Sequence, residues 1–216
     1  MLWHKIQGAG GSGGAGGGDI SFVASSSFFN DDAIIPASTS TGDLILLFEQ
    51  RNGSTSDPGT PSGFTRIFFG SGANHGQAWS YRIAQSGDAG STVVLASSGN
   101  NRSDVVVFSS STGTITYGGS FDVDSEFTSG NPAAQTILAS SGTKPLVALV
   151  GVRTGGDAVS SSFTSTSSLI TLVNGAVQFS SGYKIFNPAD TAVDITVDSG
   201  DGGTRNSLVS MYIQLS

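Results

Sequence analysis

Cysteine is absent from the 216 residues of this chain. Without thiols the fold has no disulfide bridges and no thiolate metal ligands, which fits a protein made in a reducing cytoplasm. Stability must therefore come from packing and hydrogen bonding alone.

Positive charge is also scarce. Nine Lys and Arg residues stand against sixteen Asp and Glu residues, which gives a net charge of -7 at pH 7, and the sequence contains no basic run. Nucleic-acid binding depends on clustered positive charge that neutralises phosphates. We therefore expect no nucleic-acid partner.

Long apolar runs are missing as well. The longest, residues 145–152 (PLVALVGV), is far shorter than the roughly 20 residues that a membrane helix requires. Residues 1–7 (MLWHKIQ) run directly into glycine, so they lack the apolar centre of a signal peptide. We expect neither a membrane span nor export through a signal peptide.

The chain is rich in glycine, serine and threonine, whereas charged residues make up only 12% of it. Helix-favouring residues do not recur with a 3.6-residue period, so the pattern predicts short strands joined by tight turns. Val193, Ile195 and Val197 alternate most clearly with polar residues and are expected to face a core. The expected strands lie near residues 20–24, 44–49, 65–69, 77–84, 92–96, 104–108, 120–123, 135–139, 146–152, 169–173, 177–186, 193–197 and 208–215.

The two series of strands correspond to each other at a displacement of 102 residues (44 to 146). Residues 44–47 (LILL) align with residues 146–149 (LVAL), and Asp88 aligns with Asp190. The same spacing relates Tyr81 to Tyr183, whereas residues 64–65 (FT) align with 163–164 at a displacement of 99 (64 to 163). Strands that recur while loops vary in length are typical of a duplicated β scaffold.

Four segments of the first half resemble β-sandwich modules of phage tail and virion proteins and of bacterial surface proteins. They are residues 42–48 (GDLILLF), 61–65 (PSGFT), 81–84 (YRIA) and 87–91 (GDAGS). Two positions depart from the family pattern: Phe64 stands where Trp is usual, and residues 108–110 read FSS instead of YRG. The resemblance implies a scaffold and leaves its function to context.

We therefore predict an all-β fold, a jelly-roll-like antiparallel β-sandwich spanning residues 19–216. Its two related halves are expected at about residues 19–109 and 110–216. Ile115 and Tyr117 give the link between the halves apolar anchors, which favours one structural unit over two separate tandem sandwiches.

Residues 1–18 differ from the rest because they contain eight glycines between Gly8 and Gly18. Glycine loses the most conformational freedom on ordering, so this segment is expected to dock on a neighbouring subunit that compensates the loss. Trp3 would be an anchor in a partner's pocket. The residues assigned to this assembly arm are Leu2, Trp3, Ile6, Gly8, Gly10, Gly11, Gly13 and Gly14.

Catalytic motifs are not evident. His4 and His75 are the two histidines, neither lies in a known motif, and no Gly-x-Ser-x-Gly elbow is present. Asp122, Asp124 and Glu126 alternate, and a pair of carboxylates can hydrolyse a glycoside. We interpret these three as a solvated strand edge guarded by charge.

Aromatic residues support that interpretation. Glycoside clefts stack sugars on exposed rings, whereas Trp79 alternates with Tyr81 and Ile83 as a core residue would. We therefore expect no catalytic residues, and a glycan-degrading enzyme is the least favoured hypothesis.

Two loops concentrate oxygen ligands, residues 30–32 (NDD) and 198–203 (DSGDGG). Neither has the complete spacing of an EF-hand, and Asp and Gly also suit a hairpin turn. We expect no cofactor, and calcium is the one metal that these loops leave open.

The expected function is that of a non-enzymatic structural protein of a bacteriophage particle. Capsid decoration, a head fibre and a tail fibre all fit, with other virion proteins and copies of the chain itself as partners. The alternative is an adhesin that binds a host surface glycan through loops at one end of the sandwich. In both cases the expected site of action is the virion, after synthesis in the host cytoplasm.

Overall fold

The computed structural model shows an all-β protein. It describes residues 18–29, 31–96, 101–130, 132–139, 143–153, 164–165, 171–176, 179–198 and 206–216, within which there are fifteen strands and no helix. Apart from Gly18, the predicted assembly arm lies outside the described residues.

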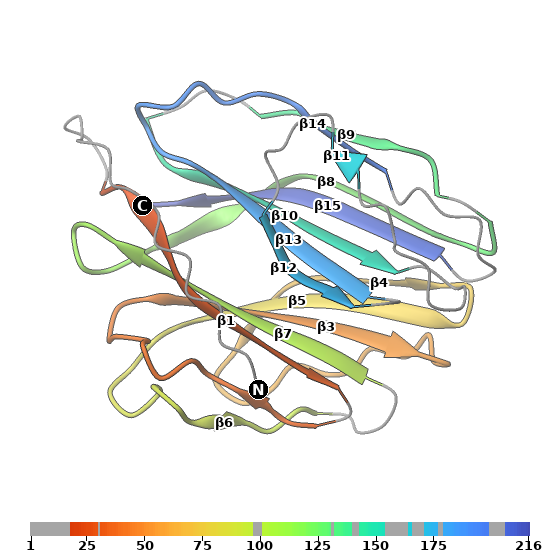
Figure 1. Ribbon diagram of the computed structural model, residues 1–216, viewed down its shortest axis with the longest axis horizontal. Coiled ribbons are helices and arrows are strands. Elements are labelled where there is room, and N and C mark those ends of the chain that lie inside the picture. The colour runs from red at the N-terminus through yellow and green to blue at the C-terminus, as the bar shows by residue number, and fades with distance from the viewer. Residues whose placement is uncertain are drawn as a thin grey trace.

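Two five-stranded antiparallel sheets face each other (Figure 1). The strand order of the first is β1 (Ile20–Phe29), β7 (Asn101–Ser110), β3 (Leu44–Asn52), β5 (His75–Ile83) and β4 (Thr65–Gly72). The strand order of the second is β12 (Thr171–Ala176), β13 (Phe179–Phe186), β10 (Leu146–Arg153), β15 (Asn206–Leu215) and β8 (Tyr117–Thr128). The antiparallel sandwich predicted from the sequence is confirmed.

Each large sheet carries a smaller sheet on its outer face (Figure 1). Behind the first lie β2 (Ala33–Ile34) and β6 (Thr92–Val93). Behind the second lie β9 (Gln135–Ile137), β14 (Ile195–Asp198) and β11 (Thr164–Ser165). The described chain thus has four β layers with three apolar interfaces between them.

Each five-stranded sheet is built by one half of the chain, and both halves use the same strand order. Numbering the large-sheet strands one to five within each half gives the order first, fifth, second, fourth, third in both sheets. The bulges also correspond. Thr65 pairs with Tyr81, and Thr171 pairs with Tyr183. In each strand the register shifts after the residue that follows the threonine, Arg66 in β4 and Leu172 in β12.

The internal repeat at a displacement of 102 residues is not confirmed, and the aligned residues differ in how well their positions agree. Asp88 and Asp190 accept from the backbone N–H three residues before them, at 2.7 and 2.8 Å, and so form the same turn. Leu44 points into the central layer, however, whereas Leu146 points into an outer layer. Successive side chains of a strand point to opposite faces of the sheet. The alignment of residues 44–47 with residues 146–149 is therefore shifted by an odd number of residues.

Two further details of the predicted architecture differ in the structure. Thr164 lies in β11 of an outer sheet, whereas Thr65 lies in β4 of a large sheet, so the alignment of residues 64–65 with 163–164 does not correspond to equivalent strands. The jelly roll is not confirmed, because among the described strands each large sheet comes from one half alone.

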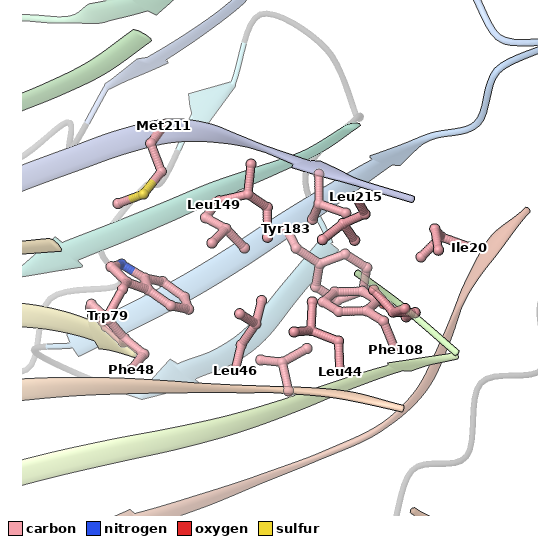
Figure 2. Packing of buried hydrophobic residues seen from close by; sticks show 14 of the residues in the cluster. Ile20, Leu44, Leu46, Phe48, Trp79, Phe108, Leu149, Tyr183, Met211 and Leu215 are labelled. Atoms are coloured by element: carbon pink, nitrogen blue, oxygen red, sulfur yellow. The ribbon is translucent and has the colours of Figure 1, made fainter. Parts of the chain in front are cut away.

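The central layer draws apolar side chains from both large sheets (Figure 2). Trp79 is fully buried and stacks on Phe48 with 4.4 Å between ring centroids, which confirms its assignment to the core. Ile115 and Tyr117 of the link between the halves pack in the same cluster. The cluster is completed by Ile20, Leu44, Leu46, Val106, Phe108, Val147, Leu149, Tyr183, Val209, Met211, Ile213 and Leu215.

The thirteen expected strands all have counterparts in the structure, and the two that were missed, β2 and β11, are two residues long. The expectation for Val193 was wrong. It is 41% exposed because β14 begins only at Ile195, which is fully buried. Val197 lies in β14, and its side chain is outside the described part of the structure.

Replacing Gly151 with Ala should destabilise the central layer. A Cβ at this position in β10 would lie 2.5 Å from the Phe48 ring and from Gln77 Oε1. Gln77 is held because its Nε2 donates to Ser207 Oγ at 2.6 Å, and the Phe48 ring is held by Trp79. We therefore expect a loss of about 1–3 kcal/mol in the free energy of unfolding. Urea denaturation measures it, and an unchanged midpoint would show that the ring shifts freely.

Candidate functional site

Polar side chains gather at one end of the central layer, where β3 ends and β5, β7 and β15 begin. Four hydrogen bonds there join the two halves of the chain. The donor and acceptor pairs are Gln50 Nε2 to Val152 O at 3.0 Å, Gln77 Nε2 to Ser207 Oγ at 2.6 Å, Arg153 Nη2 to Asn52 Oδ1 at 2.7 Å, and Ser181 Oγ to Asp104 Oδ2 at 2.7 Å. We name these residues the polar seam.

Asp104 is the charged centre of the polar seam. Its side chain is fully buried, and its second oxygen accepts from Ser27 Oγ at 2.6 Å. Arg102 Nε lies 3.6 Å from the same oxygen. The carboxylate therefore connects β1 and β7 of the first sheet to β13 of the second.

The polar seam fixes how the halves pack. Apolar layers can slide past each other at small cost, whereas a displaced seam would leave buried donors and acceptors without partners. The arrangement is consequently a structural device, and its side chains are committed to one another across the layer.

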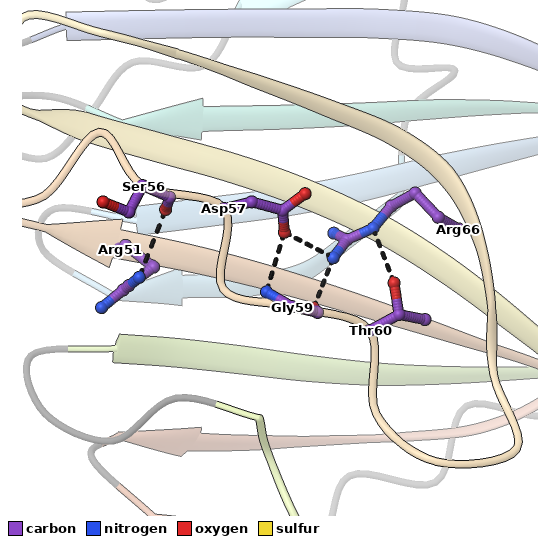
Figure 3. Close-up of polar contacts among 6 residues, drawn as sticks. All are labelled: Arg51, Ser56, Asp57, Gly59, Thr60 and Arg66. Atoms are coloured by element: carbon purple, nitrogen blue, oxygen red, sulfur yellow. Dashed lines mark hydrogen bonds and ion pairs between the residues drawn. The ribbon is translucent and has the colours of Figure 1, made fainter.

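A different polar cluster lies on the outer face of the first sheet. Residues 53–64 connect β3 to β4 and cross this face as a strap (Figure 3). Arg66 donates to Asp57 Oδ1 at 2.7 Å, to Thr60 Oγ1 at 3.2 Å and to the carbonyl of Gly59. Arg51 Nη1 donates to the carbonyl of Ser56 at 3.2 Å, so two arginines hold the strap.

The strap also has an apolar side. Pro58, Pro61 and Phe64 are buried, and Phe64 packs in the outer cluster with Ile45 and Leu47 of β3. Alternate residues of a strand share a face, so Glu49 and Arg51 extend the face that Ile45 and Leu47 begin. This places Glu49 in the layer between the first sheet and the strap.

Glu49 is 1% exposed, and neither carboxyl oxygen has a hydrogen-bond partner. Burial raises its pKa from the ordinary 4.5 to about 7, although the positive charge of Arg66 opposes the rise. Across the strands it faces Ala78 and Ser103, and the buried hydroxyls of Ser103 and Ser80 also lack partners. Glu49 is therefore a carboxyl group able to gain or lose a proton near neutral pH.

Chemically, a lone carboxyl of this kind could transfer protons, but Glu49 is enclosed beneath the closed strap, where a substrate cannot reach it. The neighbouring carboxylate, Asp57, is engaged by Arg66 and by the backbone N–H of Gly59 at 2.8 Å. The arrangement consequently favours a role within the fold over a role in turnover.

The three alternating carboxylates lie on β8, an edge strand of the second sheet. Asp122 and Asp124 are exposed, and Glu126 is half-buried. Each accepts a backbone N–H: Asp122 from Leu138, Asp124 from Ser125 at 2.8 Å, and Glu126 from Ala133 at 2.6 Å. A positive φ of 50° at Asp122 accompanies a bulge between Phe121 and Asp124, beyond which Asp124 and Glu126 pair in regular register with β15.

His75 lies in a strand. It is the first residue of β5, is fully buried, and packs against Phe127 of β8 at 5.4 Å between ring centroids. The preceding Ala73 and Asn74 have positive φ and form the hairpin turn.

The two candidate calcium loops are only partly described. Asp31 and Asp32 are exposed, and Asp32 Oδ1 accepts from Leu95 N at 2.9 Å, which ties this loop to the segment that follows β6. Residues 199–203 lie outside the described residues. In the described part of the chain, no three His, Cys, Asp or Glu side chains come together as metal ligands would.

Sequence reasoning did not single out Glu49, Gln50, Gln77 or Asp104. A signal for Glu49 was present, because residues 44–49 were read as one strand and its alternation places a carboxyl on the face of Ile45 and Leu47. The strap that buries it could not be inferred, since the sequence does not show where a twelve-residue connection packs.

Comparisons with known proteins add no identification: no family model, curated protein or solved structure matches the chain. Among the described residues no helix is long and apolar enough to cross a membrane.

Proposed function

We propose that the chain is a non-enzymatic structural component of a bacteriophage particle, made in the host cytoplasm and assembled through residues 1–18. The observation that carries the structural part is the central layer. Both halves contribute to one apolar cluster and are joined by the hydrogen bonds of the polar seam, which suits a rigid structural component. The resemblance of residues 42–48 and 61–65 to virion sandwich modules supports the setting.

The described polar groups support the non-enzymatic part. Asp122, Asp124 and Glu126 are occupied by backbone amides, and Glu49 is enclosed by the strap. Turnover of a polysaccharide or an ester that is lost on replacing one of these carboxylates would contradict the proposal.

Immunogold electron microscopy tests the setting directly. Antibodies against the purified chain should label phage particles from the source culture at one type of position, the capsid surface or the tail. The same antibodies, pre-absorbed with the chain, serve as the control. Absence of label from particles that contain the gene would overturn the proposal.

A glycan-binding adhesin is the second candidate, and Phe29 favours it. This ring is 54% exposed at the end of β1, where it pairs with Arg102 of β7. An exposed ring beside a polar side chain is a common way to stack a sugar. A glycan array should show binding that Phe29→Ala removes. If the antibodies do not label phage particles, such binding would favour the adhesin over the virion component.

A further inference from the structure

The contacts of the strap and the state of Glu49 are linked through two arginines. Arg51 and Arg66 lie on the covered face and donate hydrogen bonds to the strap (Figure 3). The acceptors are in Ser56, Asp57, Gly59 and Thr60. Each arginine also keeps one buried N–H donor without a partner, Nε of Arg51 and Nη1 of Arg66.

The same layer contains further polar groups that lack partners. Both carboxyl oxygens of Glu49 are buried and unsatisfied, and so are the hydroxyls of Ser80 and Ser103. The covered face thus holds unmatched donors on the arginines and unmatched acceptors on Glu49. A neutral carboxyl tolerates this at modest cost, whereas a carboxylate does not.

We propose that residues 53–64 form a pH-responsive strap, closed over the outer face of the first sheet while Glu49 is protonated and released when Glu49 is ionised. This inference does not rest on the proposed function. It rests on the buried position of Glu49, on the two arginines that hold the strap, and on the unmatched donors and acceptors between them.

Release follows from the needs of the carboxylate. When the Glu49 carboxyl gives its proton to solvent, its two oxygens require donors or water. Arg51 and Arg66 can supply donors only by turning toward Glu49, which weakens their hold on Ser56 and Gly59. Water can enter only where the strap lifts. Both routes loosen the same segment.

Charged groups act on Glu49 from three of the elements packed around it. Arg51 lies on β3, Arg66 on β4 and Asp57 on the strap, and all three act on Glu49. Arg82 of β5 is paired with Asp88 at 2.8 Å, toward the opposite end of β3. From β7 the covered face receives Ser103 and Asn101, which do not titrate, and β2 and β6 bring no titratable side chain.

Hydrogen exchange detected by mass spectrometry tests the proposal on the full chain. The amides of Gly59 and Phe64 report on the strap, because they donate to Asp57 Oδ1 and to the carbonyl of Pro61. After correction for intrinsic exchange, strap exchange should rise roughly tenfold or more between about pH 5.5 and about pH 8.5. Glu49→Gln should remove this rise.

Glu126→Gln is the matched control, because Glu126 is the other glutamate of the chain, lies on β8 of the second sheet and accepts from Ala133 N instead of facing the strap. It should retain the wild-type rise. Arg66→Lys gives an independent reading, since it removes the forked contacts and should raise strap exchange at both pH values. The proposal is overturned by wild-type exchange that is equal at the two pH values, by a rise that persists in Glu49→Gln, or by an unaltered strap in Arg66→Lys.

Discussion

Replacing Asp104 with Ala should lower the free energy of unfolding by about 3–5 kcal/mol, the usual loss when one partner of a buried charged contact is removed. The carboxylate is fully buried and accepts from Ser27 and Ser181, with Arg102 beside it. The substitution leaves two hydroxyls without their acceptor and removes the carboxylate that lies 3.6 Å from Arg102 Nε. Urea denaturation with a constant slope measures the loss.

Asp124→Ala is the control for that experiment. Asp124 is exposed on the edge strand β8 and accepts only from the next backbone N–H at 2.8 Å, so its removal should change stability by less than about 0.5 kcal/mol. If the two substitutions had equal effects, the polar seam would contribute nothing specific to the packing of the halves.

Replacing Glu49 with Gln should stabilise the protein at alkaline pH by up to about 3 kcal/mol, because the pKa of Glu49 rises from 4.5 to about 7 on folding. A carboxyl with a raised pKa favours the folded state in its protonated form. Its contribution is therefore fully present below about pH 4.5 and is lost as the pH rises to about 7, above which the loss stays constant.

The comparison is made by denaturation of both proteins across the pH range. The wild-type and Glu49→Gln proteins should have similar stability near pH 4 and should diverge progressively up to about pH 7. Opening of the strap would relieve part of the penalty and reduce the final difference. Parallel pH profiles would show that Glu49 ionises as easily in the folded chain as in the unfolded one.

The sequence predicted the strands well because their signal is local. Alternation and turn residues located all the strands of three residues or more, and the alternation of Trp79 with Tyr81 placed the ring in the core. The two strands that were missed, β2 and β11, are two residues long and carry too little alternation to be recognised. Val193 failed because alternation continues one step beyond the start of β14.

The candidate sites depend on contacts between distant segments, which local patterns do not contain. The sequence predicted Asp104 as the first residue of a strand. It accepts a hydrogen bond from Ser181 only because β13 of the other half packs across the central layer. Glu49 follows an apolar run and reads as a solvated strand end until the strap covers it. The repeat alignment failed at Leu44 and Leu146 for a related reason, because similarity of two apolar runs does not fix which face each residue takes.

The most direct test concerns the claim that the two halves form one structural unit. A protease site placed between Thr112 and Gly113, which are both exposed, allows the folded chain to be cut in the link. The cut halves should stay together in size-exclusion chromatography and unfold in one thermal transition, and each half alone should fail to fold because its central face is uncovered. Halves that separate after the cut and each retain cooperative unfolding would contradict the claim.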